Sequence, residues 1–166
     1  MIRKSIYIIF AASLLYFGFV YLVASGYLGK YEGPGTISSI KTPNEILDKR
    51  LKDQSDAKES IGITNEKIIL FGDLHVHTTY SSDAFLMSLP MLAGEGTHPP
   101  ADACDFARYC SSLDFWSNTD HAEDLTPQDW IEIKDTIRQC NEVSGEGPQD
   151  TIAFLGWEWT QEGGFG

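Results

Sequence analysis

The chain has 166 residues, of which 42% are hydrophobic and 22% are charged. This length and composition are typical of about one globular domain. The formal net charge of −12 and the pI of about 4.5 argue against binding to the phosphate backbone of a nucleic acid, so we expect no nucleic-acid partner.

The first 29 residues contain the longest apolar stretch of the sequence. Arg3 and Lys4 precede an uncharged run at residues 5–29, which is longer than the ~20 residues that a helix needs to cross a bilayer. We expect residues 6–28 to anchor the chain in the cell membrane as a single crossing, with the basic pair in the cytoplasm and the remainder exported. The alternative is a signal peptide cleaved near residues 23–26, which would leave a secreted or periplasmic protein.

Residues 30–66 form a polar segment of mixed charge. The sequence EGPG at residues 32–35 interrupts any helix, and no sustained apolar period follows it. We interpret residues 30–66 as a tether between the membrane and a folded domain. One short helix is conceivable at residues 44–52, where three apolar residues share a face.

From residue 67 to residue 166 the pattern changes to alternating strands and helices. Apolar runs predict three strands, at residues 68–74, 113–119 and 151–160. We expect a long loop and a helix at residues 101–111 after the first strand, and a second helix at about residues 126–143 after the second. Thr126 is placed to cap this second helix, and Pro127 suits its first position. Strands that alternate with helices pair in parallel, so we expect an α/β fold that begins an α/β barrel or an open sheet.

Three cysteines, Cys104, Cys110 and Cys140, have neither a CxxC spacing nor the spacing of a zinc finger. Packing in the core is the simplest interpretation. For an exported chain the alternative is one disulfide with an odd thiol left over.

Polar residues lie at the carboxyl end of each predicted strand. His75 and His77 follow the first strand, Asp120 and His121 follow the second, and Glu158 lies near the end of the third. Since these ends meet at one edge of a parallel sheet, where α/β proteins build their sites, we expect the side chains to converge. The two neighbouring histidines project to the same side of an extended chain. Imidazoles and carboxylates together suit zinc, manganese or iron, so the sequence predicts a metal site.

Other residues near these motifs have simpler interpretations. Trp157 and Trp159 flank Glu158, so alternation sends them to the opposite face of the strand, where we expect burial against helices. His98 precedes two prolines and is expected at the surface. The acidic residues expected to start a helix or face solvent are Asp102, Asp105, Glu123, Asp124 and Glu132.

Three stretches of the sequence together resemble a known family. Residues 72–84 (GDLHVHTTYSSDA), 113–121 (LDFWSNTDH) and 156–160 (GWEWT) resemble the first three motifs of the PHP (polymerase and histidinol phosphatase) superfamily of metal-dependent hydrolases. The resemblance covers about residues 67–162 and is strongest to a large, poorly characterised group of PHP-related bacterial proteins. It implies a distorted α/β barrel with two or three zinc, iron or manganese ions. It also implies phosphoesterase-like hydrolysis of a small phosphorylated substrate by hydroxide bound to metal.

The resemblance also implies metal ligands. His75, His77 and Glu158 resemble the ligands of one metal, with Glu158 bridging to a second. His121 resembles a ligand of a third metal together with Asp83, although the usual motif places this acid one residue earlier.

Two acids next to these ligands have supporting roles in the resemblance. Asp120 either binds a metal or orients a neighbouring group, and Asp73 supports the metal ligands without binding metal itself. Asp120, His121 and Glu158 are the residues that we expect to take part in catalysis.

The chain is shorter than the domain that the resemblance implies. A full α/β barrel takes ~250 residues, whereas three strand units follow the tether. We therefore expect an N-terminal fragment, inactive alone, whose partner is the missing C-terminal part of the same protein. Two other functions stay open: a membrane-tethered metal-binding module without catalysis, and an amidohydrolase-like enzyme that cleaves C–N or ester bonds.

Overall fold

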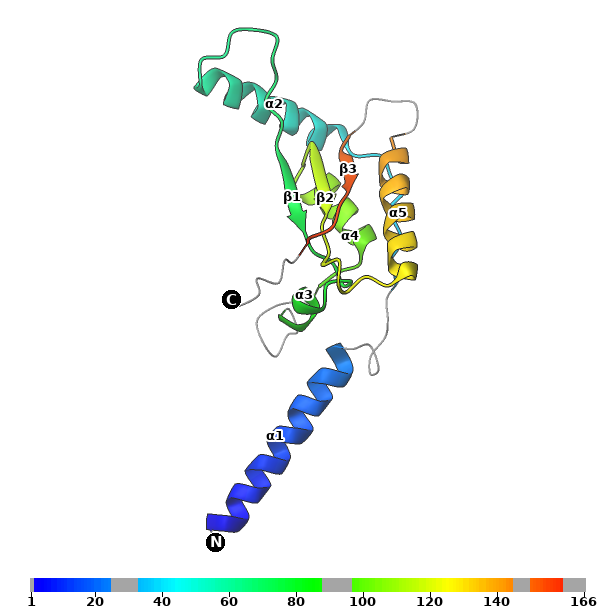
Figure 1. Cartoon of the computed structure of the whole chain (residues 1–166). Helices are drawn as coiled ribbons and strands as arrows, with labels where there is room; N and C mark the ends of the chain where they lie inside the picture. Colours follow the sequence, from blue (N-terminus) through cyan, green and yellow to red (C-terminus); the bar gives the residue numbers. More distant parts are fainter. Residues whose placement is uncertain (1, 25–32, 88–96, 145–149, 160–166) are drawn as a thin grey trace, which may run out of the picture.

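The structure is a computed structural model, and it describes residues 2–24, 33–87, 97–144 and 150–159. Figure 1 shows a long N-terminal helix, α1 (Ile2–Ala24), and a small α/β unit. The strands of this unit are β1 (Gly72–Val76), β2 (Phe115–Asn118) and β3 (Ile152–Leu155). Its helices are α2 (Asn44–Ser60), α3 (Ser82–Met87), α4 (Pro100–Asp105), the π-helix η1 (Phe106–Cys110) and α5 (Pro127–Glu142).

The three strands form one parallel sheet in the order β1-β2-β3, which confirms the predicted α/β class. Gly72 pairs with Phe115, and Phe115 pairs with Ile152, so the carboxyl ends of the strands lie at one edge. β1 begins at Gly72 instead of residue 68, and β3 ends at Leu155 instead of residue 160. The sheet is open over the described residues, and the closed barrel that the resemblance implies stays a prediction.

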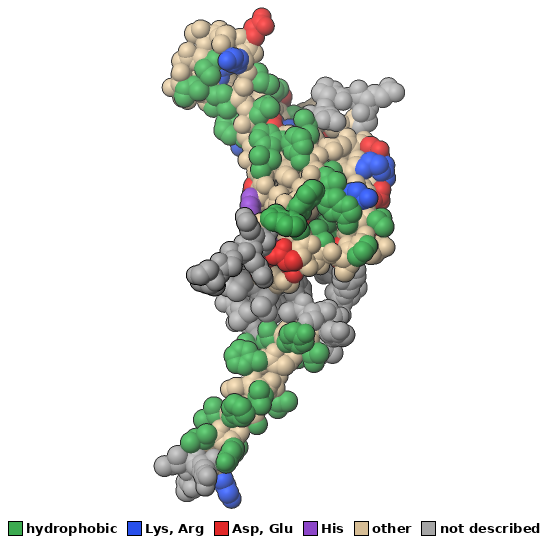
Figure 2. Space-filling view, viewed as in Figure 1, with side chains coloured by type: hydrophobic (Ala, Val, Ile, Leu, Met, Phe, Trp, Pro, Cys, Tyr) green, Lys and Arg blue, Asp and Glu red, His purple; other side chains and the backbone are tan. Residues whose placement is uncertain are grey.

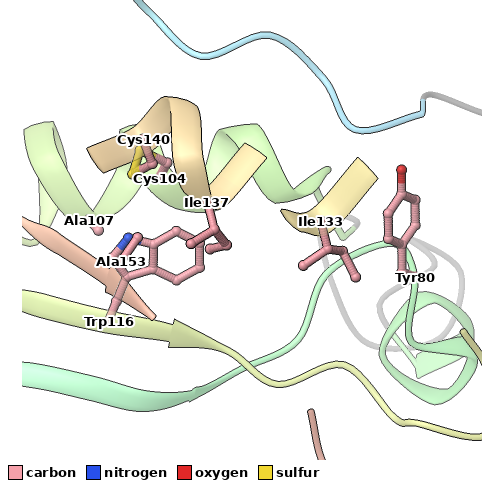
Figure 3. Close-up of a cluster of buried hydrophobic side chains, with 8 residues drawn as sticks. All are labelled: Tyr80, Cys104, Ala107, Trp116, Ile133, Ile137, Cys140 and Ala153. Carbon is pink, nitrogen blue, oxygen red and sulfur yellow. A yellow bond between two sulfur atoms is a disulfide. The ribbon is translucent and has the colours of Figure 1, made fainter. Parts of the chain in front are cut away.

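The hydrophobic core lies between one face of the sheet and the helices α4, η1 and α5 (Figure 3). Trp116 points from β2 toward these helices and is 1% exposed, and Ile133 of α5 is fully buried. Burial of a side chain of this size contributes about 1.5–3 kcal/mol. The cluster is completed by Tyr80, Cys104, Ala107, Ile137, Cys140 and Ala153. This packing holds the second and third strands against the helices that connect them.

The start of α5 follows the sequence signals closely. The Thr126 hydroxyl accepts a hydrogen bond from the Asp129 N–H at 3.2 Å, and the Asp129 carboxylate accepts one from the Thr126 N–H at 2.9 Å. Pro127 is the first helical residue. This reciprocal pair satisfies two N–H groups that the helix leaves without partners, so the predicted helix start is confirmed.

The first predicted helix forms as one continuous helix that changes from an α-helix to a π-helix. Residues 101–111 correspond to α4 followed by η1, where the turn widens at Phe106. The Ser111 N–H donates to the Phe106 carbonyl at 3.0 Å, five residues earlier, as in a π-turn.

Part of the segment predicted as a tether folds against the α/β unit. The side chain of Arg108 in η1 is fully buried and donates to the carbonyl oxygens of Ser38 at 3.1 Å and Ile40 at 2.9 Å. The same guanidinium donates to the Asp150 carboxylate at 3.0 Å. Burial raises the pKa of Asp150, but hydrogen bonds from Thr42, Ser144 and Arg108 hold it below its ordinary value. Residues 33–42 therefore pack around a buried ion pair.

The helix that we expected at residues 44–52 extends to Ser60. Arg50 donates to the carbonyl oxygen of Ser112 at 3.1 Å, and Gln54 donates to the Asp114 carboxylate at 2.7 Å. These two bonds join the middle of α2 to the residues just before β2. Figure 1 shows the last turns of α2 projecting away from the sheet.

Helix α1 is long and apolar enough over Lys4–Leu22 to serve as a membrane span or as a signal sequence. Its side chains are exposed, and Figure 2 shows hydrophobic groups along most of its length. An exposed apolar surface of this kind is unfavourable in water and favourable in a lipid bilayer.

Two of the three cysteines pair in the core. Cys104 of α4 and Cys140 of α5 form a disulfide, and both residues are buried (Figure 3). Cys110 is exposed and has a free thiol. Core packing is therefore confirmed for Cys104 and Cys140 and is wrong for Cys110, and the alternative of one disulfide with an odd thiol describes the three cysteines. Such a bond persists in an oxidising compartment and is rare in the cytosol.

We predict that the purified full chain in detergent contains one thiol that reacts with an alkylating reagent, because two of its three cysteines are joined. Mass spectrometry should find one added group before reduction and three after reduction and unfolding. Cys110→Ser should abolish the reaction before reduction. Alkylation of all three cysteines in the unreduced native chain would contradict the disulfide.

Candidate metal centre

Glu158 is held against the end of β2 by its backbone. It forms an isolated parallel bridge with His121. The Glu158 N–H donates to the carbonyl oxygen of Asp120 at 3.0 Å, and the Glu158 carbonyl accepts from the Ala122 N–H at 2.9 Å. The parallel pairing therefore continues beyond the regular end of β3. It places the Glu158 carboxylate at the edge of the sheet where His121 lies.

Gly156 allows the segment after β3 to lie close to the end of β2. A Cβ atom at Gly156 would lie 2.8 Å from the carbonyl oxygen of Asn118 and 2.8 Å from the hydroxyl oxygen of Ser117. Both distances are shorter than a carbon–oxygen contact tolerates, so a larger residue would push the two strands apart. Gly156 lies two residues before Glu158 in the sequence GWEWT, and its lack of a side chain allows the two strands to pair closely there.

His75, His77 and Glu158 form the first group of donors that could hold a metal ion. The Nε2 atoms of His75 and His77 are 3.0 Å apart. The Oε2 atom of Glu158 lies 3.3 Å from Nε2 of His75 and 2.9 Å from Nε2 of His77. The prediction that the two histidines project to the same side is confirmed.

The spacing and exposure of this triangle fit a transition metal. Nitrogen and oxygen ligands at about 2.0–2.2 Å from a tetrahedral ion lie roughly 3.3 Å from one another, close to the three distances found. The side chain of His75 is 68% exposed, whereas that of His77 is 16% exposed. One side of the group is thus open to solvent, as in metal sites that keep a position for water or substrate.

His77, Asp83 and His121 form a second group of donors. Asp83 lies in the first turn of α3, and its Oδ2 atom is 3.1 Å from Nε2 of His121. The Nδ1 atom of His121 lies 3.9 Å from Oε2 of Glu158. His77 belongs to both groups, so the five predicted ligands form one continuous cluster.

The charges of the cluster shift the pKa values of its members in opposite directions. Partial burial lowers the pKa of His121, but the hydrogen bond and charge of Asp83, together with the charge of Glu158, raise it above its ordinary value. Partial burial raises the pKa of Asp83, but hydrogen bonds from His121 and the Ala84 N–H bring it below its ordinary value. The two carboxylates of the cluster, Asp83 and Glu158, stabilise a positive charge beside them, which a cation can supply in place of a proton.

Asp120 lies behind the cluster, where it orients its neighbours. Its side chain is fully buried and accepts four hydrogen bonds. The N–H of Thr78 (2.6 Å) and the hydroxyl of Ser81 (2.9 Å) donate to Oδ1. The hydroxyl of Thr78 (2.7 Å) and the side-chain amide of Asn118 (2.8 Å) donate to Oδ2. Of the two roles that the resemblance allowed, these bonds favour orientation over metal binding.

The residues near the cluster agree in part with the expectation. Asp73 accepts from the N–H of His75 at 2.9 Å, so its hydrogen bond supports the backbone of its own strand. Asp124 accepts from the N–H and the hydroxyl of Ser82 and so fixes the start of α3 instead of simply facing solvent. His98 is at the surface as predicted, with its Nδ1 atom 3.2 Å from the Asp102 carboxylate.

The two tryptophans beside Glu158 are not buried. Trp157 is 52% exposed and Trp159 is 75% exposed, so the expectation of burial against helices is wrong. The regular strand ends at Leu155. The ring of Trp157 meets Trp130 of α5 edge to face, with 5.6 Å between the ring centroids.

Comparison with protein families gives a match over part of the chain. Residues 64–125 match a family described as "Protein of unknown function (DUF3604)". The match contains His75, His77, Asp83, Asp120 and His121 and ends before α5 and Glu158. No curated protein and no solved structure matches the chain. The matched family has no assigned activity, so the case for a function rests on the geometry of the cluster.

We predict that the full chain in detergent binds zinc through this cluster. His75→Ala and Glu158→Ala each remove one donor of the first group, and each should weaken zinc binding by more than about 100-fold, which exceeds the usual effect of losing a supporting partner. Competition with a chromophoric chelator measures the affinity. His98→Ala is the matched control, because His98 lies outside both groups and should leave the affinity unchanged. Equal affinity in all three variants would show that other residues bind the metal.

Zinc binding should weaken as the pH falls, because a histidine must lose its proton to bind a metal. Since the pKa of His121 is raised, the decline should begin above the ordinary histidine value of about 6.5. Glu123 and Glu158 also contribute to this raised pKa. Affinity that is constant between neutral pH and pH ~5 would contradict ligation by imidazoles.

Proposed function

We propose that the cluster is a divalent metal centre of a metal-dependent, phosphoesterase-like hydrolase. The observation that carries the proposal is the position of the Glu158 carboxylate. Its Oε2 atom lies 2.9, 3.3 and 3.9 Å from ring nitrogens of three different histidines, His77, His75 and His121. A single carboxylate oxygen among three imidazoles is the arrangement expected of a ligand shared between metal ions.

Zinc, manganese or iron suits these donors, and we propose a site for two to three such ions. Such ions would lower the pKa of a water toward about 7 and neutralise the oxygens of a phosphoryl group. His75, His77, His121, Asp83 and Glu158 would hold them. Asp120 would keep the surrounding turn in place.

The distribution of basic residues supports the need for a metal. Between Ile68 and Glu158 the sequence contains three basic residues, Arg108, Lys134 and Arg138. Arg108 is buried beside Asp150, and the other two lie on α5, where Arg138 pairs with acidic neighbours on the same helix. The local sequence thus supplies no cation to the cluster that could neutralise a phosphate.

The location of the domain outside the cytoplasm is part of the proposal. Helix α1 fits a single membrane crossing or a signal sequence. The Cys104–Cys140 disulfide independently supports an oxidising compartment for the remainder of the chain. A substrate would then be a small phosphorylated or ester compound that reaches the outer side of the membrane.

A metal-binding module without catalysis is the second candidate, and the exposure of the site favours it. The side chain of His75 is 68% exposed, so water reaches this part of the cluster freely. Hydrolases that activate water usually hold it in a more enclosed site, where electrostatic stabilisation is stronger. An amidohydrolase-like enzyme for C–N or ester bonds would use the same donors.

We predict that the protein hydrolyses an aryl phosphate only when zinc or manganese is present, because the metal supplies the activated water. The full chain should be assayed in detergent with zinc or manganese and after removal of metal by a chelator. His77→Ala should abolish turnover and His98→Ala should preserve it. Zinc binding without hydrolysis of a phosphate, an ester or an amide would contradict the hydrolase and leave the metal-binding module.

A further inference from the structure

The chain enters the α/β unit at the carboxyl edge of the sheet, the edge that carries the cluster. The carbonyl oxygen of Pro34 accepts a hydrogen bond from the N–H of Ala101, in the first turn of α4, at 2.9 Å. The start of α4 is itself joined to the end of β1, because the carbonyl oxygen of His98 accepts from the N–H of Thr79 at 3.0 Å. The point of entry therefore lies beside the turn that follows His77.

A short connector joins this point of entry to helix α1. Eight residues, 25–32, separate Ala24 at the end of α1 from Gly33. An extended chain advances about 3.3–3.6 Å per residue, so a connector of this length spans at most about 30 Å. Helix α1 also contacts α3, and Figure 1 shows α3 between α1 and the carboxyl ends of the strands. With α1 in a bilayer, the carboxyl edge is therefore held close to the membrane surface.

The opposite end of the unit points away from α1. Beyond the point of entry the chain passes along η1, where Arg108 donates to the carbonyl oxygens of Ser38 and Ile40. Helix α2 is then joined to the residues just before β2 by the bond from Arg50 to Ser112. These residues lie at the amino edge of the sheet, and Figure 1 shows α1 and α2 at opposite ends of the unit. The cluster thus belongs to the end nearer the membrane.

Two exposed tryptophans lie at the carboxyl edge. Trp157 and Trp159 flank Glu158, and more than half of each side chain is exposed. An indole has an apolar body and one N–H donor, and this combination is enriched where a membrane meets water. A bilayer surface would receive both rings beside the cluster. This gives a physical reason for two large apolar side chains at this position.

The charges around the cluster favour a neutral bilayer. The acidic side chains near His121 are Asp83, Glu123, Asp124 and Glu158. Anionic lipids would repel such a surface, whereas neutral lipids would not. Divalent ions in the cluster would at the same time attract a single phosphate group. The edge therefore suits a phosphorylated lipid that is diluted among neutral ones.

We propose that the cluster faces the membrane surface and that its substrate is a phosphate monoester carried by a lipid of a neutral bilayer. In the hydrolysis, the oxygen of a water bonds to phosphorus and the bond from phosphorus to the lipid oxygen breaks. One proton of that water passes to the lipid oxygen, so phosphate enters solution and the lipid alcohol stays in the bilayer. The inference rests on the proposed function for this reaction, although the orientation can be tested without it.

The orientation is tested by energy transfer in the full chain in phosphatidylcholine nanodiscs. In a Cys110→Ser background, which removes the free thiol, Glu123→Cys places a dye at the carboxyl edge and Ile61→Cys places it at the exposed end of α2. Transfer to an acceptor on the lipid head groups should be strong from position 123 and weak from position 61. Transfer from position 61 that equals or exceeds that from position 123 would overturn the inference, whatever the protein hydrolyses.

The substrate class is tested with phosphatidic acid as a minor component of these nanodiscs and with an aryl phosphate in solution, each supplied with zinc or manganese. The wild-type chain should release phosphate from phosphatidic acid faster than from the aryl phosphate. Trp159→Ser should lower the ratio of the two rates by about tenfold, because it removes apolar contact with the bilayer. Ile61→Ser is the matched control, an exposed apolar residue at the far end, and should leave the ratio unchanged.

The outcomes separate this inference from the proposed function. Hydrolysis of the aryl phosphate without hydrolysis of phosphatidic acid would overturn the lipid substrate and leave the hydrolase in place. Strong transfer from position 123 in a chain that hydrolyses neither compound would contradict the hydrolase while supporting the orientation. A mature protein found without α1 would overturn the inference, because its cluster would no longer be held at a membrane.

Discussion

The buried carboxylate of Asp120 connects the end of β2 to the turn after β1, and the arrangement of the cluster depends on this connection. A buried polar group is stable only where hydrogen bonds satisfy it, and here Thr78, Ser81 and Asn118 supply four hydrogen bonds to Asp120. Closing the turn around Asp120 brings His77 into position and places Asp83 beside His121. The histidine cluster is thus organised by a residue that does not face it.

The fold around the cluster is small, and polar and covalent links supplement its core. Eight buried residues form the main hydrophobic cluster. The Cys104–Cys140 disulfide ties α4 to α5, and Arg108 ties η1 to the chain near Ser38 and to Asp150. These links hold the helices that pack on β2 and β3, the strands from which His121 and Glu158 extend. Removing one partner of a buried ion pair typically costs about 3–5 kcal/mol, so the Arg108–Asp150 pair is important for the stability of the unit that carries the site.

Much of the cluster could be predicted because its signals are local. The parallel strands followed from alternating apolar runs and helix caps, and the convergence of His75, His77 and Glu158 followed from the shared edge of those strands. The start of α5 followed from Thr126 and Pro127. Each of these inferences needs only a few neighbouring residues.

What the sequence did not reveal depends on contacts between distant segments. Thr78 and Ser81 look like ordinary loop residues until Asp120, about forty positions later, is placed against them. The burial of Arg108 similarly requires carbonyl groups of the segment interpreted as a tether. The exposure of Trp157 and Trp159 depends on where β3 ends, and strand ends are set by pairing with neighbours more than by local propensity.

The central claim is that imidazole and carboxylate groups of this cluster bind the metal. The most direct measurement is X-ray absorption at the zinc edge of the zinc-loaded full chain in detergent. The account predicts nitrogen and oxygen ligands at about 2.0–2.2 Å with the outer scattering of imidazole rings, and a loss of that imidazole scattering in His77→Ala. A sulfur ligand at about 2.3 Å, which would indicate the free thiol of Cys110, or a spectrum without imidazole scattering would contradict it.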